Sequence, residues 1–131
     1  MIENIKVEGY KVAGPFSLAK KIDLGNSYLI YLSGVKPSRD ENGNVVTDDV
    51  AEQTRLAFEN VNKILKEAGA NLDNVVKAVI YVTDMNNFDI ISPIRGEYFK
   101  NSMPVSTMVE VNRMVLEGAK IEIEVTAILE K

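Results

Sequence analysis

The chain has 131 residues, a formal net charge of −4 and no cysteine or histidine. Disulfides, thiolate nucleophiles, cysteine-based zinc sites and imidazole acid–base chemistry are therefore excluded, and the acidic balance argues against a nucleic-acid partner. No apolar run reaches the roughly 18 residues that cross a bilayer, so we expect a cytoplasmic protein with no membrane partner and a single domain over residues 1–131.

The first part of the chain predicts β-strands. Residues 4–9 form a short candidate, and residues 16–23 and 27–33 flank Leu24-Gly25-Asn26. This tripeptide predicts a hairpin turn because Gly and Asn tolerate positive φ. The polar stretch 35–48 follows; its length suits either a functional loop or a plain surface loop.

Residues 50–68 carry the clearest helix pattern. Asp49 is a good N-cap, Glu52 follows three residues later, and Gly69 suits the position after the last turn. The apolar residues fall on one stripe at helical period: Val50, Ala57, Phe58, Val61, Ile64, Leu65 and Ala68.

The next segment, residues 75–83, predicts a strand with two apolar faces. Alternation places Val76, Ala78, Ile80 and Val82 on one face and Val75, Val79 and Tyr81 on the other.

A second, weaker helix falls within residues 87–99. Pro93 fits poorly inside a helix, so we expect Ser92 as N-cap and a helix over 93–100. Strands over 105–111 and 120–129 complete the order β-β-β-α-β-α-β-β, an α+β sheet with two helices on one face. The apolar second face requires another surface, most simply a second copy of the chain, and the number of copies stays open.

Several short segments lie along nearly the whole chain in a recognisable order and spacing: Gly14-Pro15-Phe16-Ser17, Leu32-Ser33-Gly34, Glu52-Gln53-Thr54, Asn60-Val61, Thr83-Asp84-Met85-Asn86, Pro104, Val109-Glu110-Val111, Arg113 and Ile121-Glu122-Ile123-Glu124. In that order and spacing they resemble the YjgF/RidA superfamily. The resemblance implies a chorismate-mutase-like fold and a homotrimer in which three sheets form a central barrel, with ligand clefts between neighbouring subunits.

The resemblance also implies hydrolysis of enamines and imines of the 2-iminobutanoate/2-iminopropanoate type, which gives a 2-keto acid and ammonia without metal or cofactor. An Arg suits the substrate carboxylate, and a carboxylate suits the attacking water. Glu122 matches the family's water-handling carboxylate as the catalytic residue, and Ser33, Gly34 and Thr107 match residues that bind the substrate.

Four other positions depart from the family pattern. Ser106 stands where the family has its carboxylate-binding Arg, Phe16 where it has Tyr, Ser92 where it has Asn, and Val35 where it often has Gln. Removing a charge-assisted pair from a desolvated cleft costs about 2–5 kcal/mol. We hypothesise that Arg95 in the second helix, or Lys20 on an early strand, supplies the missing cation.

Several alternatives stay open for these residues. Glu122 also fits a plain position in a wet barrel interior, Glu124 on the same face could help to bind a cation, and Arg95 could be an ordinary surface Arg. The chain is either an imine or enamine hydrolase or a non-catalytic module that binds a small metabolite. A ribonuclease or translation inhibitor is disfavoured by the acidic charge and the lack of His.

Overall fold

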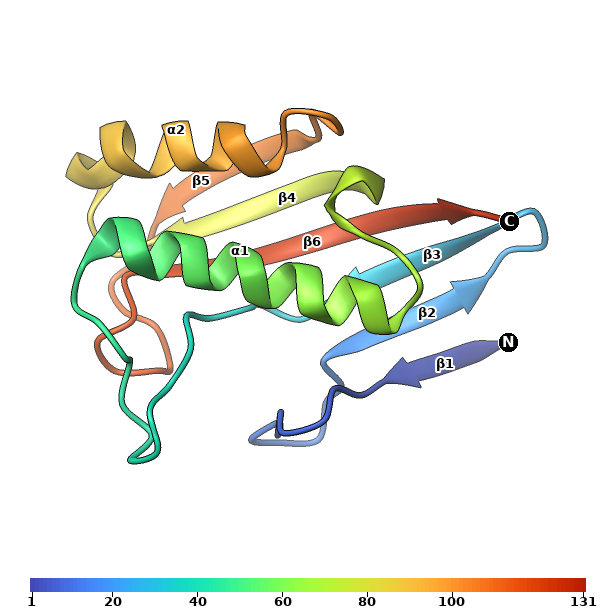
Figure 1. The fold of residues 1–131 in the computed structure, drawn as a ribbon, viewed down its shortest axis with the longest axis horizontal. Helices are drawn as coiled ribbons and strands as arrows, with labels where there is room; N and C mark the ends of the chain where they lie inside the picture. Colours follow the sequence, from blue (N-terminus) through green and yellow to red (C-terminus); the bar gives the residue numbers. More distant parts are fainter.

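The computed structural model describes residues 1–131 as one six-stranded sheet with two helices on one face (Figure 1). The α+β class and the order of the elements are as the sequence predicts, with two short 3₁₀ turns added. The strands are β1 (Ile2–Ile5), β2 (Ala19–Asp23), β3 (Ser27–Leu32), β4 (Val75–Val82), β5 (Val105–Glu110) and β6 (Ile121–Glu130); the helices are α1 (Val50–Glu67) and α2 (Phe88–Tyr98), and the turns are η1 (Leu72–Asn74) and η2 (Met85–Asn87).

The C-terminal strand β6 lies at the centre of the sheet, whose order is β1-β2-β3-β6-β4-β5. It pairs antiparallel with both β3 and β4, so those two strands run parallel to each other on either side of it. Strands β4 and β5 are parallel neighbours, as the crossover through α2 requires. Side chains of β6 are therefore surrounded by strands on both sides.

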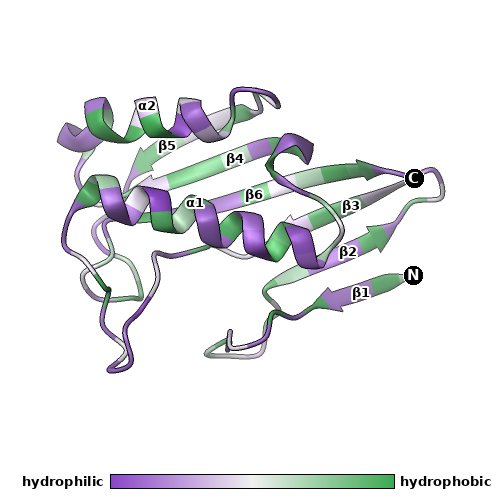
Figure 2. Ribbon diagram, in the orientation of Figure 1, coloured by the Kyte–Doolittle hydropathy of each residue, from purple (hydrophilic) through white to green (hydrophobic).

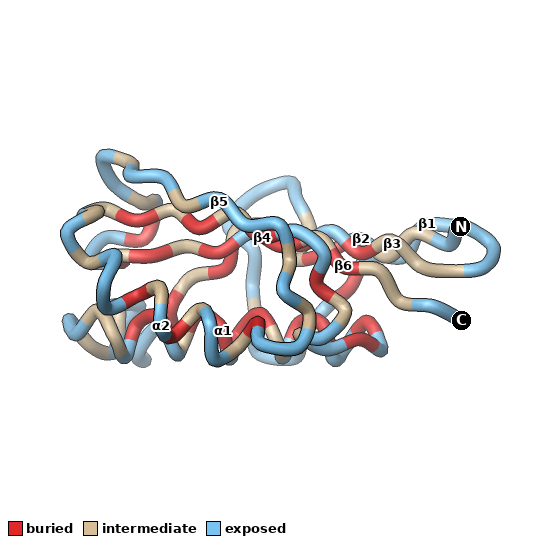
Figure 3. The backbone as a smooth tube through the Cα atoms, turned by 90° about the horizontal axis from the view of Figure 1, so that it is seen from above, coloured by how far each residue is buried: buried red, intermediate tan, exposed pale blue.

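Helix α1 has the ends that its sequence predicts. Its N-cap Asp49 accepts a hydrogen bond from the Glu52 backbone N–H at 2.8 Å, and Gly69 follows the C-cap with a φ of 85°. The predicted apolar stripe is buried except for half-buried Val50. Figure 2 shows apolar and polar residues alternating along α1, and Figure 3 shows the buried residues gathered between the helices and the sheet.

Helix α2 departs from the prediction. It begins at Phe88, so Pro93 lies in its interior and Ser92 is not an N-cap. Proline removes one backbone donor and crowds the preceding turn. The residues on both sides of it compensate, because Ile91 and Ile94 are both buried in the core. Burial of the turn before Pro93 thus extends the helix beyond what local preferences favour.

The start of β4 also departs from simple alternation. A β-bulge against β6 lies between Val75 and Lys77, which pair with adjacent residues of that strand. As a result Val75 is buried in the core and Val76 is 45% exposed, the reverse of the prediction. From Ala78 onward the alternation holds, with Ala78 facing the helices and Tyr81 the other side.

The face of the sheet that the helices leave uncovered is here called the open face. At one end it carries an apolar row that the strand register brings together, formed by Ile2, Ile22, Leu29 and Ile128. Tyr31 and Val105 add exposed apolar surface to this face, whereas Glu122 and Glu124 make its other end acidic. Neither helix has the combination of length and apolar character that crossing a membrane requires.

Candidate functional site

Glu122 projects from central strand β6 onto the open face, opposite Tyr81 of β4. The segment after β3 runs beside it because Val35 and Ile123 exchange two backbone hydrogen bonds, at 2.7 and 2.9 Å. Gly34 in this segment lies directly against the Glu122 side chain. A Cβ on Gly34 would be only 2.7 Å from Glu122 Cδ, so the carboxyl group occupies the space that any other residue would fill.

The Glu122 carboxylate is half-buried, and no hydrogen bond or ion pair within the chain holds it. Its neighbour on the same face is engaged, because the Tyr81 hydroxyl donates to Glu124 Oε1 at 3.1 Å. Burial, followed by this bond to Glu124, raises the pKa of Tyr81. Of the two carboxylates, Glu122 is therefore the one free to meet a water or a ligand.

A metal site at these two acids, one of the alternatives that the sequence left open, has no support in the geometry. No group of three or more Asp or Glu side chains is arranged to hold a metal ion.

Two hydrogen bonds hold Ser33, the residue before Gly34, in place. Its hydroxyl donates to the Ser17 carbonyl at 2.7 Å, and its backbone N–H donates to the Leu18 carbonyl at 2.9 Å. These bonds tie the end of β3 to the chain entering β2, so the backbone at Gly34 is positioned by two strands. Phe16 lies just before this contact, is 51% exposed and packs back on Gly14.

A second group of predicted residues lies between α2 and edge strand β5. The Arg95 guanidinium donates to Ser92 Oγ at 2.9 Å and to Ser106 Oγ at 3.3 Å. Ser106 pairs in register with buried Ala78, which places it on the helix side of the sheet. Sequence reasoning missed Lys100, which shares a cavity with these three residues and belongs to no recognisable motif.

The predicted site residues therefore form two groups on opposite sides of the sheet. Ser33, Gly34 and Glu122 gather at the open face, whereas Ser92, Arg95 and Ser106 gather on the helix side. Thr107 lies on the open face at the level of Val79, two strands from β6. The other suggested cation, Lys20, pairs with Tyr31 on the open face and makes no contact with the Arg95 group.

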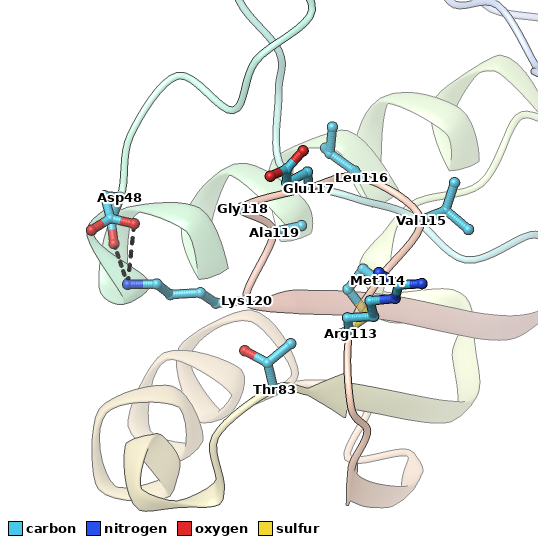
Figure 4. Close-up of a pocket in the computed structure, with 10 residues that line it drawn as sticks. All are labelled: Asp48, Thr83, Arg113, Met114, Val115, Leu116, Glu117, Gly118, Ala119 and Lys120. Carbon is cyan, nitrogen blue, oxygen red and sulfur yellow. Dashed lines mark hydrogen bonds and ion pairs between the residues drawn. The ribbon is translucent and has the colours of Figure 1, made fainter.

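A separate cavity of about 860 Å³ lies elsewhere, in the loop between β5 and β6 (Figure 4). The Lys120 ammonium bonds the Asp48 carbonyl at 2.7 Å and lies 3.4 Å from its carboxylate. Wholly buried Gln53 contacts the same loop. Its side-chain amide donates to the carbonyls of Thr47 and Gly118 and accepts a hydrogen bond from the Lys120 N–H. Gln53 thus joins the loop before α1 to the loop before β6.

Comparisons with known proteins agree on one family. Residues 9–129 match the family Endoribonuclease L-PSP. A RutC family protein of Pyrococcus abyssi is 41% identical over 79% of this chain and 79% of its own length. Human 2-iminobutanoate/2-iminopropanoate deaminase is 36% identical over 88% of this chain and 80% of its own length. The crystal structure of E. coli TdcF with bound serine covers 98% of this chain and 99% of its own, at 28% identity and a TM-score of 0.80.

The chain thus belongs to a known class of small α+β proteins. Its six-stranded sheet carries two helices on one face and, on the open face, a glutamate that packs against a glycine. The chain belongs to the YjgF/RidA superfamily.

Proposed function

We propose that this protein is a cytoplasmic homotrimer that hydrolyses small 2-imino acids and their enamine tautomers in clefts between subunits. The observation that carries the proposal is the Glu122 carboxylate, which is seated against Gly34 on the open face and has no partner within its own chain. A carboxylate surrounded by strands is rare unless it is paired or functional. The activity in the name of the human relative supports the same chemistry.

The reaction requires few functional groups from the protein. Glu122 accepts a hydrogen bond from a water molecule and takes one of its protons as the water oxygen attacks the iminium carbon. Glu122 then returns this proton to the nitrogen of the tetrahedral adduct. The C–N bond breaks as the adduct's hydroxyl becomes the carbonyl, and the hydroxyl proton passes to the departing ammonia. One iminium ion and one water thereby give one 2-keto acid and one ammonium ion, with no change in oxidation state.

Assembly into a trimer is part of the proposal. The open face bears an apolar row formed by Ile2, Ile22, Leu29 and Ile128, together with Tyr31 at 49% exposed, and a lone subunit would leave this surface in water. Arg95 and Glu122 of one chain lie on opposite sides of the sheet, so a site that uses both must take one of them from a neighbouring copy. Sedimentation at low micromolar concentration tests this directly, and a stable monomer would contradict it.

A second candidate function is capture of a small metabolite without conversion. Ser106 in place of the family's Arg, together with half-exposed Phe16 in place of its Tyr, favours this alternative. The bound serine of TdcF supports a small ligand with a carboxylate in either case. The two candidates differ only in whether Glu122 turns the ligand over.

The deciding experiment generates 2-imino acids with an amino-acid oxidase and measures 2-keto acid release with and without the protein. We expect acceleration over spontaneous hydrolysis, and a loss of roughly 10²-fold or more in Glu122→Gln. Glu124→Gln is the matched control, since that carboxylate is bound to Tyr81 and is expected to leave the rate within about threefold. No acceleration by the unmodified protein, combined with a thermal shift by 2-keto or amino acids, would establish the binding function instead.

A further inference from the structure

The cavity between α2 and β5, about 500 Å³, is lined by eight residues among which two are cationic and none is acidic. Arg95 and Lys100 supply the charge, Ser92 and Ser106 supply hydroxyls, and Met103 and Pro104 form part of the apolar wall. Such a lining favours a small anion, because a cation or a neutral apolar ligand would leave both positive charges uncompensated.

Arg95 is half-buried and has no acidic partner. None of the chain's three ion pairs includes it, and its two hydrogen bonds go to neutral serine hydroxyls. Its guanidinium carbon also lies 5.9 Å from the centroid of the Phe88 ring. The more exposed Arg55, by contrast, forms a two-point pair with Glu97 at 2.7 and 3.3 Å. The charge of Arg95 is thus held in place and left unmatched.

The two serines fix the direction of the guanidinium and use only part of its hydrogen-bonding capacity. A guanidinium has five N–H donors, and the serines accept from Nη1 and Nη2 with one bond each. The remaining donors are free to meet an anion in the cavity. Ser106 is short enough to admit Arg95 beside it, and a long cationic side chain at 106 would compete for the same space and repel it.

We infer that Arg95, supported by Ser92 and Ser106 and assisted by Lys100, is the receptor for the carboxylate of the ligand. This inference rests on the proposed function, because that function makes the ligand a 2-imino or 2-keto acid. The cation comes from helix α2, whereas the family pattern takes it from strand β5. The geometry of one chain further requires that the Glu122 acting on this ligand belong to a neighbouring copy.

Binding of a stable product-like acid tests the assignment without turnover. Titration calorimetry with 2-ketobutanoate is compared for the unmodified protein, Arg95→Ala and the control Arg39→Ala, whose side chain is exposed and makes no hydrogen bond or ion pair. We expect Arg95→Ala to weaken binding by about 10²-fold, Arg39→Ala by less than twofold, and the methyl ester of the acid to bind both variants equally.

A charge swap and a second anion sharpen the test. The double variant Arg95→Ala/Ser106→Arg is expected to recover binding to within about tenfold of the unmodified protein, because it returns one guanidinium to the same cavity. Arg95→Gln replaces Arg95→Ala if that variant does not fold, as judged by circular dichroism. Unchanged 2-ketobutanoate binding in the Arg95 variant would overturn the inference, and so would tighter binding of inorganic phosphate than of the keto acid.

Failure of the subsite and failure of the proposed function give different results. Arg95-dependent binding of 2-ketobutanoate with no turnover of imines would leave the carboxylate receptor in place and remove the hydrolase. Imine turnover with the same KM in Arg95→Ala as in the unmodified protein would keep the hydrolase and remove the receptor.

Discussion

Gln53 of α1 is expected to make a large contribution to the stability of the fold. It is wholly buried, and its amide makes three hydrogen bonds of 2.8–3.0 Å to the backbone of two loops. Gln53→Leu keeps the approximate size and leaves two carbonyls and one N–H without their partner. Each orphaned buried group costs about 1–3 kcal/mol.

The magnitude follows from how far water can reach these groups. Gly118 is exposed and Thr47 is half-buried, so water can partly replace the lost hydrogen bonds of their carbonyls. The Lys120 N–H instead donates to the oxygen of the wholly buried Gln53 side chain, where water replaces the lost bond less easily. Greater burial of apolar surface by Leu offsets part of the loss. We therefore expect a net destabilisation of about 2–4 kcal/mol, of which the Lys120 N–H accounts for the largest share.

Urea denaturation at one fixed protein concentration measures the effect, because oligomers gain apparent stability with concentration. With a slope of about 2 kcal/mol per molar urea, the midpoint is expected to fall by about 1–2 M. Thr54→Val is the matched control, since Thr54 is equally buried but its hydroxyl bonds only the Val50 carbonyl within the same helix. We expect it to cost less than about 1 kcal/mol, and a Gln53→Leu protein as stable as this control would refute the reasoning.

Three further outcomes are expected. Gly34→Ala would displace the Glu122 carboxyl group, whose Cδ lies 2.7 Å from the new Cβ position. Imine turnover should therefore fall at least tenfold at nearly unchanged melting temperature. Full activity would contradict the proposed position of the Glu122 carboxylate against Gly34. The hydrogen bond from Arg55 lowers the pKa of Glu97 below its ordinary 4.5. The stability difference between the unmodified protein and Glu97→Gln should therefore persist above pH 4.5 and disappear as the pH falls through the folded-state pKa of Glu97. Melting curves from pH 7 to 3 measure this difference, and a difference that stays constant with pH would contradict a stabilising Arg55–Glu97 pair. Met103→Gly should stabilise by about 0.5 kcal/mol in chemical denaturation, because Met103 is 81% exposed and has a φ of 43°, and a clear loss of stability would mean that its side chain packs against something.

Local rules predicted the elements whose local and tertiary preferences agree. Asp49, the apolar stripe and Gly69 all indicate the same helix, and α1 follows them. The turn at Gly25 was found for the same reason, since its φ of 98° requires a residue such as glycine. Where a long-range contact opposes a local rule, the prediction failed: burial of Ile91 carries α2 back past Pro93, and pairing with β6 inserts the bulge at Val76.

The site was predictable in its parts and not in its arrangement. Glu122 and Gly34 could be singled out because they match a family pattern, and the structure adds that one fills the space beside the other. The bonds from Arg95 to Ser92 and Ser106 depend on how α2 lies along β5, which no local pattern records. No sequence pattern indicates Lys100 as a site residue, because lysines are common near the C-terminal ends of helices.

The bulge in β4 has a practical consequence for studying assembly. It leaves Val76 unpaired and 45% exposed, at a position where the strand already departs from regular pairing. Because the chain has no cysteine, Val76→Cys would supply a single attachment point for a spin label. Dipolar spectroscopy between such labels would then test the proposed assembly and report the spacing of its subunits without any tag on the ends of the polypeptide.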